Sequence, residues 1–409
     1  MIALPLAELP PLGALDRRSD VITGVQVDSR RIEHGDLFVA LGRGVDFLED
    51  ALGRGAAATL VPERPFEALA AIGGAVRERA SAQVVGITGS TGKTSTKDIL
   101  AALCALSART VAAEASYNNE VGVPLTLCRL EPDTEVCILE LAMRGFGQIA
   151  ELCRIARPAI GVVTNVGPAH LELVGSLEGV LRAKGELVAA LPAGGTAIVP
   201  AEFPVERDDV EVVRLAEPEV ELEDGRTRVG GVSFNFVSRH QTENAAAALA
   251  ALDALGLRRP DRVDVAFSRW RDEEIPLPGG GLLINDAYNA NPISMRAALA
   301  HLAERAGSRR RVAVLGDMAE LGSGGPAFHQ EIGELAAANR VKALVAVGEL
   351  ARGYLEGATG IAVTRWCPDA RAAVAATEEV VEPGDCVLVK GSRAVGLEVV
   401  AEALAAVNA

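Results

Sequence analysis

The stretch Val84–Leu100, VVGITGSTGKTSTKDIL, decides the fold of this 409-residue chain. Its apolar first residues predict a buried strand, and a helix is expected from Thr94 to about Leu106. A glycine-rich turn lies between the two. A strand, a glycine turn and a helix N-terminus together form a binding site for anions, because unpaired backbone N–H groups and the helix dipole point to one place.

The turn reads G-S-T-G-K-T, and its glycines let the backbone approach a phosphate group without a Cβ atom in the way. We expect the Lys93 ammonium to reach the β- and γ-phosphates and the Thr94 hydroxyl to bind Mg²⁺. The longer Walker A pattern has one more glycine, at the position where this chain has Ile87. The predicted nucleoside triphosphate site comprises Gly89, Ser90, Thr91, Gly92, Lys93, Thr94 and Ser95.

Composition limits the classes of partner. The chain has 40 basic and 55 acidic side chains, a net charge of −15, so nucleic acid is not an expected partner. The first residues, MIALPLAELPPLGALDRR, lack a basic region, and prolines interrupt their apolar run, which argues against a signal peptide. No apolar run is long enough to span a bilayer, so no membrane contact is expected. The 6 cysteines have no C-x-x-C spacing, which favours free buried thiols and a cytoplasmic protein.

The order of the predicted elements indicates an α/β protein. A small α/β unit, residues 1–81, precedes the glycine turn, and from Val84 strands and helices alternate as in a doubly wound parallel sheet. A further α/β repeat follows Pro276–Gly281, which we interpret as a hinge linker. Central strands are expected at Val136–Glu140, Ile160–Asn165 and Thr196–Val199, with helices at Gly147–Ala156, Leu177–Leu191 and Gln241–Leu255. Later strands are expected at Leu282–Asn285, Arg311–Leu315, Ala343–Val347 and Cys386–Val389.

Three central residues could contribute to chemistry, and each has a simpler interpretation. Glu140 ends a predicted strand and could bind Mg²⁺ beside Thr94, or it could be an exposed strand-end carboxylate. His170 lies in a turn after a strand, where a lone histidine is more often structural than a ligand. Lys184 lies on a predicted helix, and sequence pattern alone favours a solvated surface lysine.

Polar residues also gather after strands of the last repeat. One set suggests contact with a nucleotide base or ribose and consists of Asp286, Tyr288, Asn289 and Asn291. The alternative for this set is an ordinary polar loop at the end of a strand. A second set repeats this arrangement: Asp317, Glu320 and His329. Lys390 and Arg393 on the last glycine turn suggest a clamp for carboxylate or phosphate.

Together these segments resemble the Mur ligases of cell-wall synthesis. The resemblance runs from about residue 84 to 398, in family order, and its segments are GITGSTGKTSTK, SYNNEVGVPLTL, LELAMRGFGQIAEL, TNVGPAHLELVGS with AKGEL, INDAYNANPISMRAAL, VLGDMAELG and LVKGSR. It implies three domains. These are a UDP-sugar-binding domain (1–81), a central ATP-binding domain with a parallel sheet (82–275) and a Rossmann-like domain for the amine substrate (276–409).

The resemblance also implies roles for single residues. Lys93, His170 and Lys184 are the expected catalytic residues. Lys184 would be carbamylated, and the carbamate would help Thr94, Glu140 and His170 hold two Mg²⁺ ions. ATP contacts outside the glycine turn are implied for Asn244, Asp286, Tyr288 and Asn289. Substrate contacts are implied or expected for Asp28, Ser29, Arg30, Asn118, Asn119, Asp317, Glu320, Lys390 and Arg393.

DAYNANP and GDMAELG resemble the members of the family that perform the last amide-adding step. This implies a monomer that joins D-Ala-D-Ala to UDP-MurNAc-tripeptide through an acyl phosphate. A paralogous ligase acting on another carboxylate is the nearest alternative, favoured only by the loop LGRGVDFLEDAL, which is shorter than usual. The segment PLPGGGLLIND lacks the family's Gly-Arg, which bears on one nucleotide or hinge contact and not on the chemistry. A P-loop GTPase would carry an N-K-x-D segment, which the chain lacks. A non-catalytic subunit should have lost Lys93, Glu140, His170 or Lys184.

Overall fold

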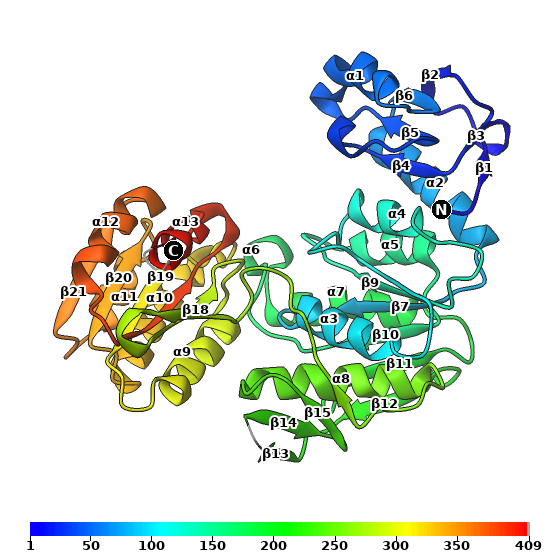
Figure 1. The fold of residues 1–409 in the computed structure, drawn as a ribbon. Coiled ribbons are helices and arrows are strands. Elements are labelled where there is room, and N and C mark those ends of the chain that lie inside the picture. Colours follow the sequence, from blue (N-terminus) through cyan, green and yellow to red (C-terminus); the bar gives the residue numbers. More distant parts are fainter. Residues whose placement is uncertain (224, 407–409) are drawn as a thin grey trace. The chain divides into compact units, whose positions relative to one another are not determined.

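The computed structural model describes residues 1–223 and 225–406, which fold into two compact units (Figure 1). The first unit comprises Met1–Asn165, Ala183–Phe236 and Thr242–Ala266. The second comprises Val166–Arg182, Val237–Gln241 and the described residues from Phe267 onward. The predicted α/β class is confirmed, whereas the predicted domain boundaries at residues 81 and 275 stay predictions.

The N-terminal part of the first unit is a small mixed sheet in the order β2-β6-β5-β4, with a separate strand pair β1-β3. Its strands are β1 (Leu4–Pro5), β2 (Gly13–Arg17), β3 (Val21–Ile22), β4 (Gly24–Gln26), β5 (Asp36–Val39) and β6 (Ala58–Pro62). Its helices are α1 (Leu48–Gly53) and α2 (Pro65–Arg79). β4, β5 and β6 pair in parallel, and β2 is antiparallel to β6.

The central sheet of the first unit is wholly parallel, in the order β12-β11-β10-β7-β9-β8. Its strands are β7 (Gln83–Thr88), β8 (Thr110–Ala112), β9 (Val136–Glu140), β10 (Ile160–Val163), β11 (Thr196–Pro200) and β12 (Glu211–Leu215). The connecting helices are α3 (Lys93–Cys104), α4 (Gly122–Leu127), α5 (Gln148–Ala156), α6 (Leu171–Val174), α7 (Leu177–Ala189) and α8 (Arg239–Ala254). Because β7 lies between β9 and β10, the glycine turn after β7 is flanked by the carboxyl ends of both neighbours.

A small sheet was not predicted from the sequence. It has the order β13-β14-β15-β16 and comprises Val220–Glu223, Arg226–Val229, Val232–Phe234 and Arg262–Val263. β13 is exposed along its whole length, so its apolar residues do not follow the inward and outward alternation that marks a half-buried strand.

The second unit contains a six-stranded sheet in the order β17-β18-β22-β19-β20-β21, parallel except for β17. The strands are β17 (Glu273–Leu277), β18 (Gly281–Asp286), β19 (Arg311–Gly316), β20 (Ala343–Val347), β21 (Val363–Cys367) and β22 (Cys386–Lys390). The helices are α9 (Pro292–Ala306), α10 (Gly325–Ala338), α11 (Arg352–Gly357), α12 (Ala370–Val380) and α13 (Glu398–Ala406). Alternate residues of β19 enter two separate apolar cores, so both faces of this sheet are covered.

The interpretation of Pro276–Gly281 as a hinge linker is wrong. Pro276 pairs with Leu282, and Leu277 pairs with Gly281, so the segment is the tight turn of an antiparallel hairpin. Gly279 adopts φ 67°, a conformation that glycine reaches without strain, and this explains the glycine run.

Two expectations from composition agree with the structure. All 6 cysteines are buried and free, as expected. Within residues 1–223 and 225–406, no helix combines the length and the apolar character needed to cross a bilayer.

Candidate active site

The glycine turn after β7 is packed too closely for side chains at two positions. Gly89 and Gly92 have φ values of 148° and 76°. A Cβ atom at Gly89 would lie 1.9 Å from Thr164 Oγ1, and one at Gly92 would lie 2.2 Å from Asn244 Oδ1. The two glycines therefore allow the tight turn that leads directly into the N-terminus of α3, the arrangement typical of an anion-binding loop.

Asn165, at the end of β10, holds the turn in place. Its side-chain oxygen accepts from the Thr91 N–H at 2.9 Å, and its amide donates to Thr91 Oγ1 at 2.7 Å. Lys93 Nζ donates to the Gly89 carbonyl at 2.9 Å, so the ammonium lies against the same loop. The predicted ATP contact Asn244, on α8, also belongs here, because its side-chain oxygen accepts from Thr96 Oγ1 at 3.4 Å.

Glu140 lies beside the turn, at the carboxyl end of β9. Thr94 Oγ1 donates to Glu140 Oε2 at 2.7 Å, and Asn118 Nδ2 donates to Glu140 Oε1 at 2.8 Å. Glu140 is only 1% exposed, so its interpretation as an exposed strand-end carboxylate is wrong. The structure thus brings together the two side chains, Thr94 and Glu140, that the sequence assigned to a metal.

Lys184 is fully buried on α7, so its interpretation as a surface lysine is wrong as well. Burial and the nearby Lys93 hold the pKa of the Lys184 amine well below its usual value, although Glu140 and Glu186 oppose this shift. Within the described part of the chain, Lys184 Nζ has no hydrogen-bond partner. A buried amine that is easily deprotonated and lacks a hydrogen-bond partner is suited to chemical modification. The modified group could then form the polar contacts that the amine lacks.

Glu186, two residues further along α7, accepts hydrogen bonds from the backbone of Gly147 at 2.6 Å and of Ala150 at 3.1 Å. These N–H groups belong to the start of α5, so Glu186 joins α7 to α5 and fixes the helix that carries Lys184.

His170 belongs to the second unit, whereas Glu140 belongs to the first. Its Nδ1 pairs with the carboxylate of Glu320, also in the second unit. Both residues have left-handed backbone conformations, with φ values of 57° and 62°. The loop after β10 and the loop after β19 therefore meet through a strained pair of predicted site residues.

Asp286, Asn289 and Lys390 form one cluster at the ends of β18 and β22. Lys390 is 2% exposed, and its Nζ donates to Asp286 Oδ2 and, at 2.9 Å, to the Asn289 carbonyl. Its ammonium is thus engaged within the loop that follows β18. Arg393, expected beside it in a clamp, pairs with Glu398 and stacks on Trp270 at 4.8 Å from the ring centre.

The loop after β19 uses two predicted residues for internal support. Asp317 Oδ1 accepts from the Ala351 N–H at 2.6 Å, and burial raises the pKa of this carboxyl. His329 Nε2 accepts from the Met318 N–H at 2.9 Å, and its Nδ1 lies 2.7 Å from the Gly325 carbonyl. This pairing requires a neutral ring, and burial lowers the pKa of His329 accordingly.

The two predicted substrate segments of the first unit also make internal contacts. Asp28 caps the turn that follows it, and hydrogen bonds from Arg30 lower the Asp28 pKa to about 2. Ser29 is buried between them, whereas the Arg30 side chain is 81% exposed. Asn119 Oδ1 accepts from the Gly122 N–H at 3.0 Å, at the start of α4, so the two asparagines of SYNNEVG have different partners.

Sequence reasoning missed two cationic residues near these sites. The Arg271 guanidinium lies 4.1 Å from the ring centre of Tyr288, a predicted ATP contact. Lys97, on α3, is only 3% exposed although it is charged. The one available signal for Lys97 was its position four residues after Lys93, which places both on one side of α3.

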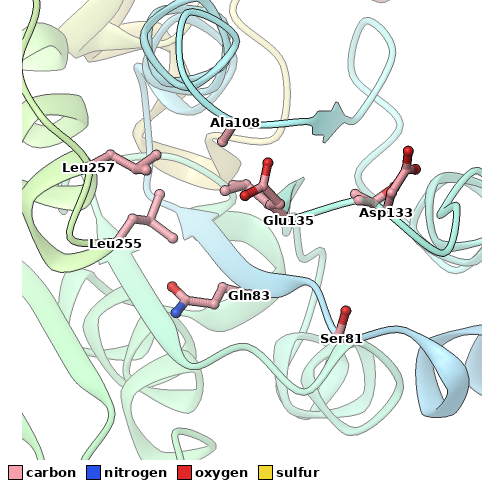
Figure 2. Close-up of a pocket in the computed structure, with 9 residues that line it drawn as sticks. Ser81, Gln83, Ala108, Asp133, Glu135, Leu255 and Leu257 are labelled. Carbon is pink, nitrogen blue, oxygen red and sulfur yellow. The ribbon is translucent and has the colours of Figure 1, made fainter.

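The pocket in Figure 2 lies away from this site. It has a volume of about 350 Å³, and its lining includes Gln83 at the start of β7 and Val136 at the start of β9 (Figure 2). The glycine turn follows the other end of β7, so the two features lie at opposite ends of the sheet. Among the described residues, no group of three or more His, Cys, Asp and Glu side chains could hold a metal ion. A cation at Thr94 and Glu140 would therefore need further oxygen ligands.

Comparison with known proteins places these features in a family. The family model described as "Mur ligase middle domain" matches residues 87–252. The family model described as "Mur ligase, glutamate ligase domain" matches residues 270–393. The UDP-N-acetylmuramoyl-tripeptide–D-alanyl-D-alanine ligase of Synechocystis is 35% identical, over 95% of this chain and 93% of its own.

Solved structures give the same result. A crystal structure of MurF from Acinetobacter baumannii superposes with a TM-score of 0.83 at 28% identity, covering 96% of each chain. MurF from Thermotoga maritima in complex with ADP has a TM-score of 0.78 at 26% identity, covering 94% of this chain and 97% of its own.

Proposed function

The chain belongs to the Mur ligase family, and from that membership we infer that it is the ATP-dependent ligase that joins D-Ala-D-Ala to UDP-MurNAc-tripeptide. The reaction is a step of peptidoglycan precursor synthesis and forms ADP and phosphate. The observation that carries the inference is the pairing of Thr94 with Glu140 directly behind a phosphate-binding turn, close to the buried Lys184.

The chemistry proceeds in two steps. A carboxylate oxygen of the acceptor peptide attacks the γ-phosphorus of ATP, and the bond to the β–γ bridging oxygen breaks to give an acyl phosphate and ADP. The free amine of D-Ala-D-Ala then attacks the acyl carbon, the amide forms, phosphate leaves, and the ammonium proton goes to solvent. Both steps depend on positioning and on neutralising phosphate charge.

The first unit supplies most of that positioning. The N–H groups at the N-terminus of α3 bind the phosphates, and Asn165, which accepts from the Thr91 N–H, keeps the glycine turn in shape. The Lys93 ammonium moves from the Gly89 carbonyl to the transferring phosphoryl group, whose charge it stabilises. We also propose that Asn244, Asp286, Tyr288 and Asn289 bind the nucleotide, with Arg271 supporting Tyr288.

Mg²⁺ fits the residues present. Thr94 and Glu140 offer hard oxygen ligands that are already oriented toward each other, and the unpaired amine of Lys184 fits a carbamate. When bound, Mg²⁺ neutralises charge on the phosphate oxygens. We propose that Thr94, Glu140, His170 and carbamylated Lys184 hold two such ions.

We also propose that each part of the chain binds a different substrate. Residues 1–81 bind the UDP-sugar with Asp28, Ser29 and Arg30, residues 82–275 bind ATP, and residues 276–409 bind the amine. Asn118, Asn119, Asp317, Glu320, Lys390 and Arg393 line or support the substrate sites. We also propose a monomer that acts in the cytoplasm, where ATP is available and buried thiols such as these stay reduced.

Phosphate release tests the assignment. Release should require UDP-MurNAc-tripeptide and D-Ala-D-Ala together with ATP, because the acyl phosphate forms only on the acceptor carboxylate. Omitting either substrate should abolish turnover. Faster turnover with a different carboxylate and the same amine would favour the paralogous ligase, which the short segment of residues 41–52 keeps as the alternative.

A further inference from the structure

Lys97 is a buried cation with no direct role in the reaction proposed above. It lies on α3, four residues after Lys93, and is 3% exposed. Its Nζ donates to the carbonyls of Ala113 at 2.8 Å and Ala115 at 3.1 Å, and lies 2.8 Å from the Asp98 carboxylate. Burial of an ammonium costs free energy unless its donors are fully paired. We therefore expect the contacts of Lys97 to have a specific structural role.

The two carbonyl contacts are with the loop between β8 and α4. Ala115 has φ 45°, which a non-glycine residue adopts only when its surroundings hold it there. Lys97 binds the carbonyls at this strained point. Three residues later, the Asn118 carbonyl accepts from the Ala142 N–H at 2.9 Å, so the loop is tied to the end of β9 as well.

The Asn118 side chain then reaches Glu140. Its amide donates to Glu140 Oε1 at 2.8 Å, while Thr94 Oγ1 donates to the other carboxylate oxygen at 2.7 Å. Both oxygens of Glu140 are thereby fixed, one from α3 directly and one through the loop that Lys97 anchors to α3. Partners of this kind set the orientation of metal ligands and their affinity.

We propose that Lys97 and Asn118 are positioning residues that act in series. Lys97 fixes the loop of residues 113–118, the loop fixes Asn118, and Asn118 fixes the carboxylate of Glu140 for a divalent cation bound with nucleotide. This deepens the proposed function, on which it rests, by assigning to Lys97 and Asn118 the orientation of a metal ligand.

The test is Mn²⁺ binding in the presence of ADP, followed by electron paramagnetic resonance, in the full-length protein. Lys97→Met keeps the apolar stem of the side chain and removes its donors, and Asn118→Ala removes only the contact with Glu140. Each should weaken Mn²⁺ binding about tenfold, the lower end for lost supporting partners of metal ligands. The exposed Lys342→Met is the matched control and should bind Mn²⁺ like the wild type.

The double variant distinguishes a series from two unrelated effects. If the residues act in series, Lys97→Met with Asn118→Ala should weaken Mn²⁺ binding no more than either single change. A loss equal to the product of the two single losses would overturn the proposal, and so would wild-type Mn²⁺ binding in either single variant. ADP binding without a divalent cation should be unchanged, which separates positioning of the metal ligand from damage to the phosphate site.

Two further measurements complete the design. If Lys97→Met does not fold, Lys97→Arg replaces it, since the longer side chain misplaces the donors and should still weaken Mn²⁺ binding. Wild-type turnover with both substrates is measured first. An inactive wild type would overturn the proposed function, whereas an active wild type with unaffected variants would overturn only the role of Lys97 and Asn118.

Discussion

The hydroxyl of Thr94 donates a 2.7 Å hydrogen bond to the carboxylate of Glu140, although 46 positions separate the two residues in the chain. Thr94 is the second residue of α3 and Glu140 ends β9, the strand beside β7 in the central sheet. The parallel register therefore brings a metal-binding hydroxyl and a carboxylate together at the end of the sheet where phosphates bind.

Glu140→Gln should test this pair with little change of shape. The substitution removes the negative charge, so the Mg²⁺ concentration needed for half-maximal turnover should rise about 10- to 100-fold. The measurement is initial rate against Mg²⁺ concentration at saturating ATP. An unchanged Mg²⁺ requirement would remove Glu140 from the metal site.

Lys93→Ala should lower kcat by at least about 100-fold, as does loss of other groups that stabilise transition-state charge. The fold should persist, since the Lys93 side chain is only partly buried and its ammonium donates to the carbonyl of Gly89 in a loop. Circular dichroism checks the fold, and steady-state kinetics checks the rate. Near-normal turnover would refute the assignment of the glycine turn as the ATP site.

Lys184 should carry a carbamate that depends on dissolved carbon dioxide. Carbamate formation requires the neutral amine, and burial, with repulsion from Lys93, lowers the Lys184 pKa and so favours this form. Activity should fall when carbon dioxide is stripped and return with bicarbonate, and labelled bicarbonate should give a carbamate carbon signal by nuclear magnetic resonance. Lys184→Ala should lose activity and signal while ADP still binds.

For that prediction, Lys342→Ala is the control, because this lysine is exposed and should retain both activity and the signal. Activity that is independent of carbon dioxide, together with an unlabelled wild type, would mean that Lys184 acts without modification.

His301 and Glu274 should make the stability of the second unit depend on pH. His301 Nε2 lies 3.2 Å from Asp272 Oδ1 and 3.4 Å from Glu274 Oε1. Burial alone would lower the His301 pKa, but these carboxylates outweigh it and raise the pKa above 6.5. Burial would raise the Glu274 pKa, but His301 and Arg305 lower it from 4.5 to about 2.

The contributions of His301 and Glu274 to stability depend on pH in opposite directions. The His301 contribution is present below pH 6.5 and is lost as pH rises through its folded-state pKa, whereas the Glu274 contribution is present above pH 4.5 and is lost as pH falls toward 2. The melting temperature should therefore decrease above about pH 6.5, and His301→Gln should flatten that decrease. Calorimetry between pH 5 and 9 checks both, and parallel curves for wild type and variant would contradict the assignment.

Much of the site was predictable because local patterns encode it. The glycine turn carries its own conformational requirements at Gly89 and Gly92, and an apolar run marks each buried strand. The carboxyl ends of neighbouring parallel strands lie at the same edge of the sheet, so the sequence alone predicts that Glu140 lies near Thr94.

The remainder depends on contacts between distant segments. The burial of Lys184 and of Lys97 is set by helices and loops packed around them, which no periodicity reveals. The sequence Pro276–Gly281 resembles a linker because turns and linkers share proline and glycine, and only strand pairing distinguishes them. Lys390 was expected to face a ligand, but its position opposite Asp286 in the paired strands β18 and β22 directs it to that carboxylate.

Isotope transfer tests whether the amide forms through an acyl phosphate at the glycine turn. The acceptor UDP-MurNAc-tripeptide is prepared with ¹⁸O in its terminal carboxylate and incubated with ATP, Mg²⁺ and D-Ala-D-Ala, and the released phosphate is analysed by mass spectrometry. If the acyl phosphate forms, the products are ADP and phosphate that carries one ¹⁸O atom, because the attacking carboxylate oxygen leaves with the phosphoryl group. Phosphate without ¹⁸O, or release of AMP in place of ADP, would contradict it.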